Sequence, residues 1–459
     1  MSQPECSICL NQRINKMIKA LTALIYSMFI FAINGLSTPH KAYRGNIWAM
    51  FAMGTAILWG LYELNPEYLA PTITALTAGA LTGIIAAHKI SMPNLPQMIA
   101  LLNGLGGLAA GLIGITETSN ADYHPLLLLF IISIGFITFT GSIAAFLKLA
   151  GTRLLISKDT LQAVSLIVLV LTVISGFYAY NNSSEYLWGF IVLLSLWGLL
   201  FILPIGGADM PIIISILNSF SGWSTVLVGF SFNNTLLIIV GTLIGASGTI
   251  LSYIMTKAMN RSLRKVIFSP PQTITDDIPN ENKTIHQGSP QDAAFLMENA
   301  NKVIIVPGYG MAAAGAQHEL VNMAKILKNK YKVDVKFAIH PVAGRMPGHM
   351  NVLLAEADIN PDDVFELKDI NQEFQTADVA YVIGANDTTN PLAKTKSDSP
   401  IYQMPILEVE QARKVLFVKR SLAAGYSGID NPLFYADNTL MLLGDAKEVT
   451  KQIVANLEE

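Results

Sequence analysis

The chain has 459 residues, of which 52% are hydrophobic and only 14% are charged, and its mean hydropathy is +0.44. Soluble domains carry about 25% charged residues, so the composition predicts that much of the chain lies in a lipid bilayer. The formal net charge of −3 gives no sign of a nucleic-acid partner, and two cysteines are too few for a disulfide-built fold.

The N-terminal tail holds both cysteines, Cys6 and Cys9, in the sequence ECSIC. A CxxC pair can be redox-active or can form half of a metal site, but no second pair follows it. We interpret the pair as part of a polar tail without specific chemistry. The first 36 residues resemble a signal peptide in the order of their charges. No small-residue cleavage site stands out, so we keep the apolar part as a first span.

Apolar stretches of membrane-crossing length make up the following region. A helix needs about 20 apolar residues to cross the hydrocarbon core. Nine stretches qualify as candidates, at roughly 17–36, 46–63, 69–88, 95–115, 125–147, 160–180, 186–204, 210–231 and 234–256. The sequence therefore predicts a transmembrane helical domain over residues 1–256, with about nine spans.

Basic residues concentrate in alternate loops between these stretches. One set of loops contains Lys41, Arg44, Lys89, Lys148, Arg153, Lys158, Lys257, Arg261, Arg264 and Lys265, whereas the other set is acidic or uncharged. The positive-inside rule then places the C-terminal part of the chain in the cytoplasm. Arg13, Lys16 and Lys19 precede the first span on the opposite side and are the exception.

Three polar residues lie within or beside the spans. Asn103 lies in ALLNGLGGLAAGLIG, and GADMPIIISILNSFSGW contains Asp209 and Asn218. Polar side chains in a membrane are costly, so the two asparagines either form interhelical hydrogen bonds or line a hydrated path for a small ion. Asp209 could instead cap a helix at the membrane surface. Composition alone does not decide among these interpretations.

Residues 257–286 are basic at first and then rich in Pro, Asn and Asp, which is typical of a linker. From residue 287 to 459, short apolar stretches alternate with amphipathic ones. The expected strands are KVIIVPG, VDVKFAIHP, DVAYVIGAND, KVLFVKRS and NTLMLLGDA. This alternation predicts a soluble α/β Rossmann-like domain, with a doubly wound parallel sheet.

The first of these strands ends in a glycine pattern. Gly308 and Gly310 occupy the first two positions of G-x-G-x-x-G/A, and Ala313 occupies the third. Small residues let the backbone approach a pyrophosphate, and the N-terminus of the next helix then faces the phosphates. The pattern predicts a nucleotide site, although a simple tight turn would look similar.

The choice of nucleotide depends on charge. An NAD site usually has a carboxylate at the end of the second strand, but FAIHPVAGR has none. Lys419 and Arg420 follow the strand VLFV, where cations could hold a 2′-phosphate, although they could also be a solvated pair. NADP is therefore favoured over NAD. The sequence contains no convincing nucleophile, acid–base pair or metal cluster, and hydride exchange between two nicotinamides needs none.

Several long motifs together resemble the β subunit of the proton-translocating NAD(P) transhydrogenase. They are PGYGMAAAGAQ, HPVAGRMPGHMNVLLAEA, GANDTTNP, KRSLAAGYSGIDNPLF and GDAK in the soluble half, and GADMPIIISILNSFSGW and LSYIMTKAMNRS in the membrane half. The resemblance covers nearly the whole chain after about the first 40 residues. It is far more specific than the glycine pattern alone.

The resemblance implies a division of labour between two subunits. This chain would supply membrane helices and bind NADP(H), while an α subunit would bind NAD(H) and add further helices. Hydride would pass directly between the two nicotinamides in a Re/Si-specific reaction, and inward proton movement would drive it. The chain would be a multi-pass protein of the inner (plasma) membrane, and the α–β assembly would be a dimer.

The resemblance also assigns residues. The NADP(H) site would comprise Gly308, Tyr309, Gly310, Ala313, Arg345, Gly384, Asn386, Asp387, Lys419, Arg420, Ser421, Tyr426 and Gly428. Among these, Lys419, Arg420 and Ser421 would hold the 2′-phosphate. Asn103, Asp209 and Asn218 would line the proton path, and Arg261 and Asp387 would couple the two halves.

Asn103 marks a departure from the family pattern, because some members have a histidine at the matching position. Asparagine does not titrate, so we expect the histidine on the α subunit and Asn103 as a polar neighbour. Two other functions fit the architecture. One is a transporter or channel gated by a regulatory nucleotide-binding domain, and the other is a membrane-tethered NADP-dependent dehydrogenase.

Overall fold

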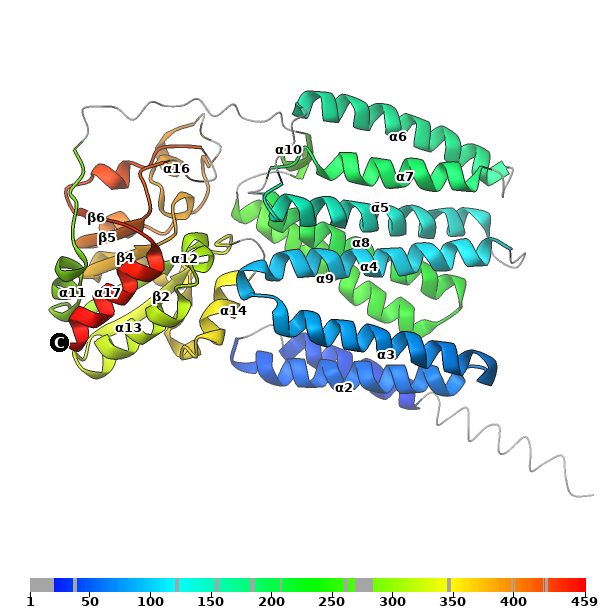
Figure 1. Cartoon of the computed structure of the whole chain (residues 1–459), viewed down its shortest axis with the longest axis horizontal. Coiled ribbons are helices and arrows are strands. Elements are labelled where there is room, and N and C mark those ends of the chain that lie inside the picture. Colours follow the sequence, from blue (N-terminus) through cyan, green and yellow to red (C-terminus); the bar gives the residue numbers. More distant parts are fainter. Residues whose placement is uncertain are drawn as a thin grey trace, which may run out of the picture.

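The structure is a computed structural model that describes residues 20–35, 39–119, 124–152, 157–181, 186–206, 209–259, 263–268, 284–344, 348–397, 399, 401–423, 425 and 428–459. Long helices lie side by side in one part, and an α/β domain lies at one end of these helices (Figure 1). The predicted fold class is confirmed, because long apolar helices precede a parallel sheet covered by helices.

The membrane part contains α2 (Pro39–Glu63), α3 (Pro66–Lys89), α4 (Leu95–Thr116), α5 (Pro125–Leu149), α6 (Lys158–Asn181), α7 (Leu187–Ile202), α8 (Met210–Ser231) and α9 (Thr235–Ala258). Six helices of the described chain are long and apolar enough to cross a membrane: α3, α4, α5, α6, α8 and α9. They coincide with six of the nine predicted spans, and the number of spans stays a prediction. The stretch Ala20–Gly35 and α7 are apolar but shorter, and α2 is not among the six. These three spans stay predictions.

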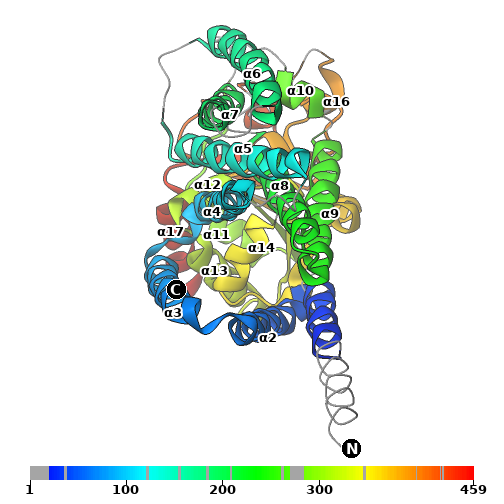
Figure 2. The same ribbon diagram turned by 90° about the vertical axis from the view of Figure 1, so that its right-hand side faces the viewer.

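Glycines set how closely the membrane helices approach one another. A Cβ atom on Gly135 of α5 would lie 2.6 Å from the backbone nitrogen of Gly111 in α4. A Cβ on Gly222 of α8 would lie 2.3 Å from the nitrogen of Gly245 in α9. Lipid provides little hydrophobic drive for helix association, so small residues that permit close backbone contact hold such pairs together. Figure 2 looks along the bundle and shows α4, α5 and α8 as neighbours.

The α/β domain is built on a six-stranded sheet in the order β3-β2-β1-β4-β5-β6, in which every pair is parallel. The strands are β1 (Lys302–Pro307), β2 (Asp334–Ile339), β3 (Val364–Glu366), β4 (Val379–Ile383), β5 (Lys414–Lys419) and β6 (Thr439–Leu443). The helices are α11 (Pro290–Glu298), α12 (Tyr309–Ala314), α13 (Gln317–Asn329), α14 (His349–Glu356), α15 (Leu367–Ile370), α16 (Leu392–Thr395) and α17 (Ala446–Glu458). This strand order is the one found in dinucleotide-binding folds.

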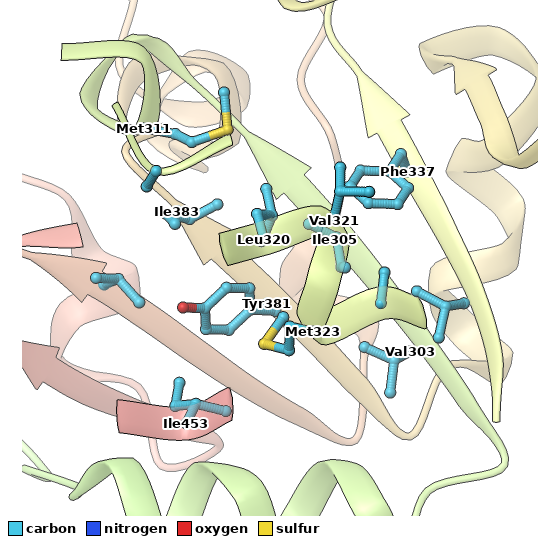
Figure 3. Close-up of a cluster of buried hydrophobic side chains, with 14 of the residues drawn as sticks. Val303, Ile305, Met311, Leu320, Val321, Met323, Phe337, Tyr381, Ile383 and Ile453 are labelled. Atoms are coloured by element: carbon cyan, nitrogen blue, oxygen red, sulfur yellow. The ribbon is translucent and has the colours of Figure 1, made fainter. Parts of the chain in front are cut away.

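The sheet separates two hydrophobic cores, because successive strand residues point to opposite faces. Val303 and Ile305 of β1 face the core beneath α11 to α14 and α17, where Leu320 and Tyr381 also lie (Figure 3). Ile304 points to the other core, which short helices and turns cover. The Tyr381 hydroxyl is buried in the first core and lies 3.0 Å from the hydroxyl of Thr450.

The five predicted strands are present, but two details of the domain differ from the prediction. A short helix, α12, separates the glycine pattern from α13, the amphipathic helix that the stretch AQHELVNMAKILKNKY predicts; Gly315, with φ of +64° in the left-handed region, ends α12. The short strand β3 was not predicted. It has three residues, none of them fully buried, so it lacks the apolar run that identifies a strand.

Two contacts tie the membrane helices to the chain that follows them. The short helix α10 (Leu263–Phe268) buries Val266 in a cluster with Ile205 and Met210. The 3-10 turn η1 (Met92–Asn94), which connects α3 to α4, lies against α12, with Cα atoms within 8 Å. The end of the bundle that carries Lys89 therefore faces the α/β domain (Figure 1).

Candidate functional site

The loops after β1 and β4 meet where the strand order of the sheet reverses. The backbone N–H of Gly308 donates to the carbonyl of Ile383 at 2.9 Å, and the N–H of Gly310 donates to the carbonyl of Gly384, also at 2.9 Å. In doubly wound sheets, ligands bind outside the carboxyl ends of the strands at this point. The glycine pattern predicted from the sequence therefore lies at the expected position of the fold.

The three glycines at this point have a packing role. Gly384 has φ of +68°, and a Cβ on it would lie 2.2 Å from the nitrogen of Met311. A Cβ on Gly308 would lie 2.4 Å from the Gly384 carbonyl oxygen. Only glycine permits this interlocking of two loops. Beside them Tyr309 is half-buried, with its ring centroid 6.4 Å from that of His349, and Ala313 is exposed.

A second layer of loops covers the residues after Gly384. A Cβ on Gly425 would lie 2.3 Å from Nδ2 of Asn386 and 2.9 Å from Oδ1 of Asp387, so this loop rests directly on both side chains. The Asn431 side-chain amide donates to Oδ1 of Asn386 at 3.0 Å. Among the described residues, nothing accepts a hydrogen bond from the buried Nδ2 of Asn386. Buried polar atoms are rarely left unpaired, so this donor suits a bound acceptor.

Lys419 lies at the end of β5, close to two carboxylates. Burial lowers the pKa of Lys419, while the charges of Asp387 and Asp430 oppose that shift. Its ammonium group donates to the carbonyl of Ala423 and lies 4.6 Å from the ring centroid of Phe434. A partly desolvated cation beside the Asp387 loop can attract an anionic ligand more strongly than a fully solvated lysine can.

Arg420, the next residue, forms an ion pair with Asp445, the N-cap residue of α17. Its Nη2 and Nε donate to Oδ2 of Asp445 at 2.7 and 3.2 Å. Ser421 follows as an exposed residue, and Gly428 adopts φ of +71°. The predicted site residues Arg345 and Tyr426 lie outside the described residues, as does the predicted coupling residue Arg261.

The end of β2 holds a histidine where an NAD site usually has a carboxylate. His340 is buried, with Nε2 2.6 Å from the carbonyl oxygen of Pro405, and its Nδ1 accepts from the N–H of Val342. Burial lowers the pKa of His340 to about 4, although the bond to Pro405 works in the other direction. The ring is thus neutral at physiological pH. Both ring nitrogens are already hydrogen-bonded, and the uncharged ring cannot replace a carboxylate in binding a ribose hydroxyl.

In the membrane part, Asn103 lies at the interface of α4 and α8. Its Nδ2 donates to the carbonyl of Ile214 at 3.4 Å, and its own backbone carbonyl accepts from the Ser221 hydroxyl at 3.1 Å. Asn218 lies four residues after Ile214 and three before Ser221, which places it on the same face of α8. It is half-buried. The structure therefore brings Asn103 and Asn218 to one helix interface.

Asp209 lies apart from these two residues. It is buried at the N-cap position of α8, about 13 Å along the helix from Asn218 at 1.5 Å per residue. Its side chain forms no capping hydrogen bond, so the predicted capping role is wrong, although the position is right. Nearby, the ammonium group of Lys148 at the end of α5 donates to the carbonyl of Ile205 at 2.7 Å.

The sequence reasoning missed four residues that shape the site: His340, Asp430, Asn431 and Asp445. Asp430 and Asn431 stand in the motif GIDNPLF, and Asp445 stands in GDAK. Both motifs contributed to the family resemblance, but their acidic and amide side chains received no role. The partners that tie them to the site, such as Asn386 for Asn431 and Arg420 for Asp445, are 45 and 25 residues away in sequence, and only the fold reveals such pairs.

The chain is similar to known proteins over nearly its whole length. The model of the family described as "NAD(P) transhydrogenase beta subunit" matches residues 18–456. Two curated sequences from Rhodospirillum rubrum, both named "NAD(P) transhydrogenase subunit beta", are 48% identical to the chain over 447 residues. Each alignment covers 93% of this chain and 96% of the relative.

Proposed function

Because the chain belongs to the family of NAD(P) transhydrogenase beta subunits, we propose that it binds NADP(H) at the carboxyl edge of its sheet and exchanges hydride with NAD(H) on a partner subunit. In this proposal the reaction is Re/Si-specific and is coupled to proton movement through the membrane helices. The functional division is residues 1–256 for the membrane part, 257–286 for the linker and 287–459 for the nucleotide domain.

The observation that carries the nucleotide proposal is the position of positive charge. Lys419 and Arg420 lie at the end of β5, whereas the end of β2 holds the neutral, fully bonded His340. A 2′-phosphate needs cations, so the adenosine half of the nucleotide belongs over β5. The pyrophosphate then lies near Gly308, Gly310 and the unpaired donor of Asn386. This orientation is the reverse of the one in which an acid after β2 holds the ribose.

The remaining assigned residues complete this site. Tyr309, Ala313, Gly384 and Asp387 border the same crevice, Ser421 assists the 2′-phosphate cations, and the loop with Tyr426 and Gly428 closes over the nucleotide. Arg345 also contributes to binding of the nucleotide. The nicotinamides supply the hydride chemistry, while the protein binds and orients them and excludes water.

The proton path in this proposal runs along the interface of α4 and α8, past Asn103 and Asn218, with Asp209 at one end and Arg261 at the junction. Asn103 does not titrate, so a histidine on the alpha subunit binds and releases the proton. Moving one charge through about 100 mV supplies about 2.3 kcal/mol. That energy shifts a hydride equilibrium by about fiftyfold. The assembly is a dimer of α–β units in the plasma membrane, with the nucleotide domain in the cytoplasm.

The test is hydride transfer from NADH to an NADP⁺ analogue by the full chain assembled with its NAD-binding partner. Lys419→Gln is expected to raise the KM for NADP⁺ at least about tenfold and to leave the KM for NADH unchanged, since a lost charge-assisted bond removes about 1.5–3 kcal/mol. Lys414→Gln, at the other end of the same strand, is the matched control. No transfer by the wild-type assembly would favour a transporter gated by a regulatory nucleotide domain.

A further inference from the structure

The two carboxylate oxygens of Asp445, in the motif GDAK, accept hydrogen bonds from different partners. As the N-cap of α17, it accepts the backbone N–H of Lys447 through Oδ1 at 3.0 Å. Through Oδ2 it accepts both Nη2 and Nε of Arg420, at 2.7 and 3.2 Å. A backbone hydrogen bond also joins the segments that carry Asp445 and Arg420, because the N–H of Gly444 donates to the carbonyl of Lys419 at 2.9 Å.

Helix capping alone does not explain why this residue is an aspartate. Asparagine or serine caps a helix about as well, since one side-chain oxygen is enough. The second carboxylate oxygen is the one that Arg420 uses. Stability is not a sufficient explanation either, because the Arg420 side chain is 68% exposed and exposed ion pairs stabilise proteins little.

The geometry of the pair leaves N–H donors of Arg420 available to bind another anion. A guanidinium group has five N–H donors in a planar fork, and side-on pairing through Nε and Nη2 leaves three of them for a further acceptor. The carboxylate is itself held by α17, so the fork is fixed relative to the end of β5 before any ligand arrives. Although partial burial opposes it, the bonds from Arg420 and Lys447 lower the pKa of Asp445, so the carboxylate stays ionised.

We propose that Asp445 is a positioning residue that orients Arg420 toward the 2′-phosphate and so contributes to the preference for NADP(H) over NAD(H). This inference rests on the proposed function of the site. Arginine has many rotamers, and restricting them beforehand lowers the entropy lost on binding. The negative charge of Asp445 would also repel the phosphate, but Arg420, which pairs with Asp445 at 2.7 Å, neutralises that charge. Positioning therefore outweighs repulsion.

The experiment measures binding to the full chain, assembled with its partner, of two probes that differ only in the 2′-phosphate: adenosine 2′,5′-bisphosphate and 5′-AMP. Asp445→Asn keeps the helix cap and removes the pairing oxygen. We expect it to weaken binding of the bisphosphate about fivefold, which corresponds to about 1 kcal/mol, and to leave 5′-AMP binding unchanged. Glu448→Gln is the matched control, since it removes an exposed charge from the same helical turn without a bond to Arg420.

A second comparison separates positioning from a general structural effect. In an Arg420→Gln background, Asp445→Asn should no longer change bisphosphate binding, because there is no fork left to orient. Tighter or unchanged bisphosphate binding in the single variant would overturn the inference, as would an equal loss for 5′-AMP. If the wild-type assembly itself does not prefer the bisphosphate to 5′-AMP, the proposed function fails instead.

Discussion

The carboxyl edge of the sheet and the interface of α4 with α8 both bring polar groups together, but they use different chemistry. At the sheet edge, Lys419 lies among Asp387 and Asp430, and Arg420 pairs with Asp445. Between α4 and α8, the hydrogen bonds of the described residues join an asparagine amide, a serine hydroxyl and backbone carbonyls. Charges are tolerated at the edge because water reaches it, whereas an ionised group inside the bilayer is far more costly.

This difference limits what each region can do. The sheet edge can attract a phosphate and respond to its charge. The helix interface can rearrange hydrogen bonds, but its amides and hydroxyls do not take up protons at physiological pH. A proton-coupled function therefore needs a titratable group from outside this interface. That requirement agrees with our proposal that the partner subunit supplies a histidine.

The largest expected effect comes from breaking the sheet edge at Gly384. In Gly384→Ala, a methyl group would meet the nitrogen of Met311 at 2.2 Å while the backbone keeps φ of +68°. Both loops would have to move apart, at a cost of about 4 kcal/mol or more. We expect loss of NADP(H) binding, measured by nicotinamide fluorescence. The membrane helices, followed by hydrogen exchange, should remain protected.

Gly315→Ala is the matched control for that variant. Gly315 has a similar φ of +64°, but a Cβ there would meet nothing within 4 Å. Only the backbone strain remains, about 1–2 kcal/mol. If both variants lose nucleotide binding equally, strain and not the interlocking of the two loops determines the role of Gly384.

These glycines also show what sequence can predict. The alternation of apolar strands and amphipathic helices predicted a parallel, doubly wound sheet, because such a sheet follows from local periodicity and general rules of chain connection. The pattern at Gly308 and Gly310, between an apolar strand and a helix, predicted a nucleotide site at the end of that strand. It could not reveal that Gly384, 74 residues beyond Gly310, takes part in the same packing. That contact exists only once β1 and β4 are neighbours.

The side-chain pairs of the site were less predictable for the same reason. Lys419 and Arg420 were identified from their position after a strand. Two of the carboxylates that face them, Asp387 after β4 and Asp445 after β6, come from other loops that only the folded sheet brings together. His340 gave a partial signal, because the missing acid after β2 could be read from the sequence. The burial of His340 and its hydrogen bond to Pro405 could not be predicted from the sequence.

The second prediction tests the helix interface. Asn103→Leu keeps the number and branching of the side-chain heavy atoms but removes the hydrogen bond to the Ile214 carbonyl. Such bonds contribute only about 0.6 kcal/mol to membrane-protein stability on average, so we expect the protein to fold. Proton pumping during hydride transfer should fall about tenfold or more if the interface lines the path. NADP(H) binding, at the distant sheet edge, should stay within about twofold of wild type.

Leu102→Asn provides the comparison for this variant. Leu102 precedes Asn103 on α4 but is 54% exposed on the outside of the described helices. In the double variant Leu102→Asn with Asn103→Leu, the amide on the outer face of α4 should not restore proton pumping. Unchanged proton pumping in Asn103→Leu would exclude this interface from the proton path and would leave Asn103 as a structural bond between α4 and α8.

The smallest effect is expected at a third polar cluster, at the opposite edge of the sheet. Glu373 accepts hydrogen bonds from Lys302 of β1 at 3.0 Å and from Lys336 of β2 at 2.7 Å. This cluster is charged like the carboxyl edge but has no ligand role in our proposal. Glu373→Gln should destabilise the ends of β1 and β2 by about 1–2 kcal/mol at neutral pH without changing NADP(H) binding. Hydrogen exchange of these strands measures the change.

The pH dependence of that difference follows from the pKa of Glu373. Partial burial raises it, but the bonds from Lys336 and Lys302 outweigh burial and leave the pKa below the usual value. A carboxylate with a depressed pKa stabilises the fold above its unfolded pKa, about 4.3, and loses that contribution as the pH falls through its folded pKa. The gap between wild type and Glu373→Gln should therefore be constant from about pH 6 to 8 and close below about pH 4. Glu366→Gln, an exposed change on β3, should show no such gap. A gap that persists in acid would mean that the shape of the side chain, and not its charge, holds this edge together.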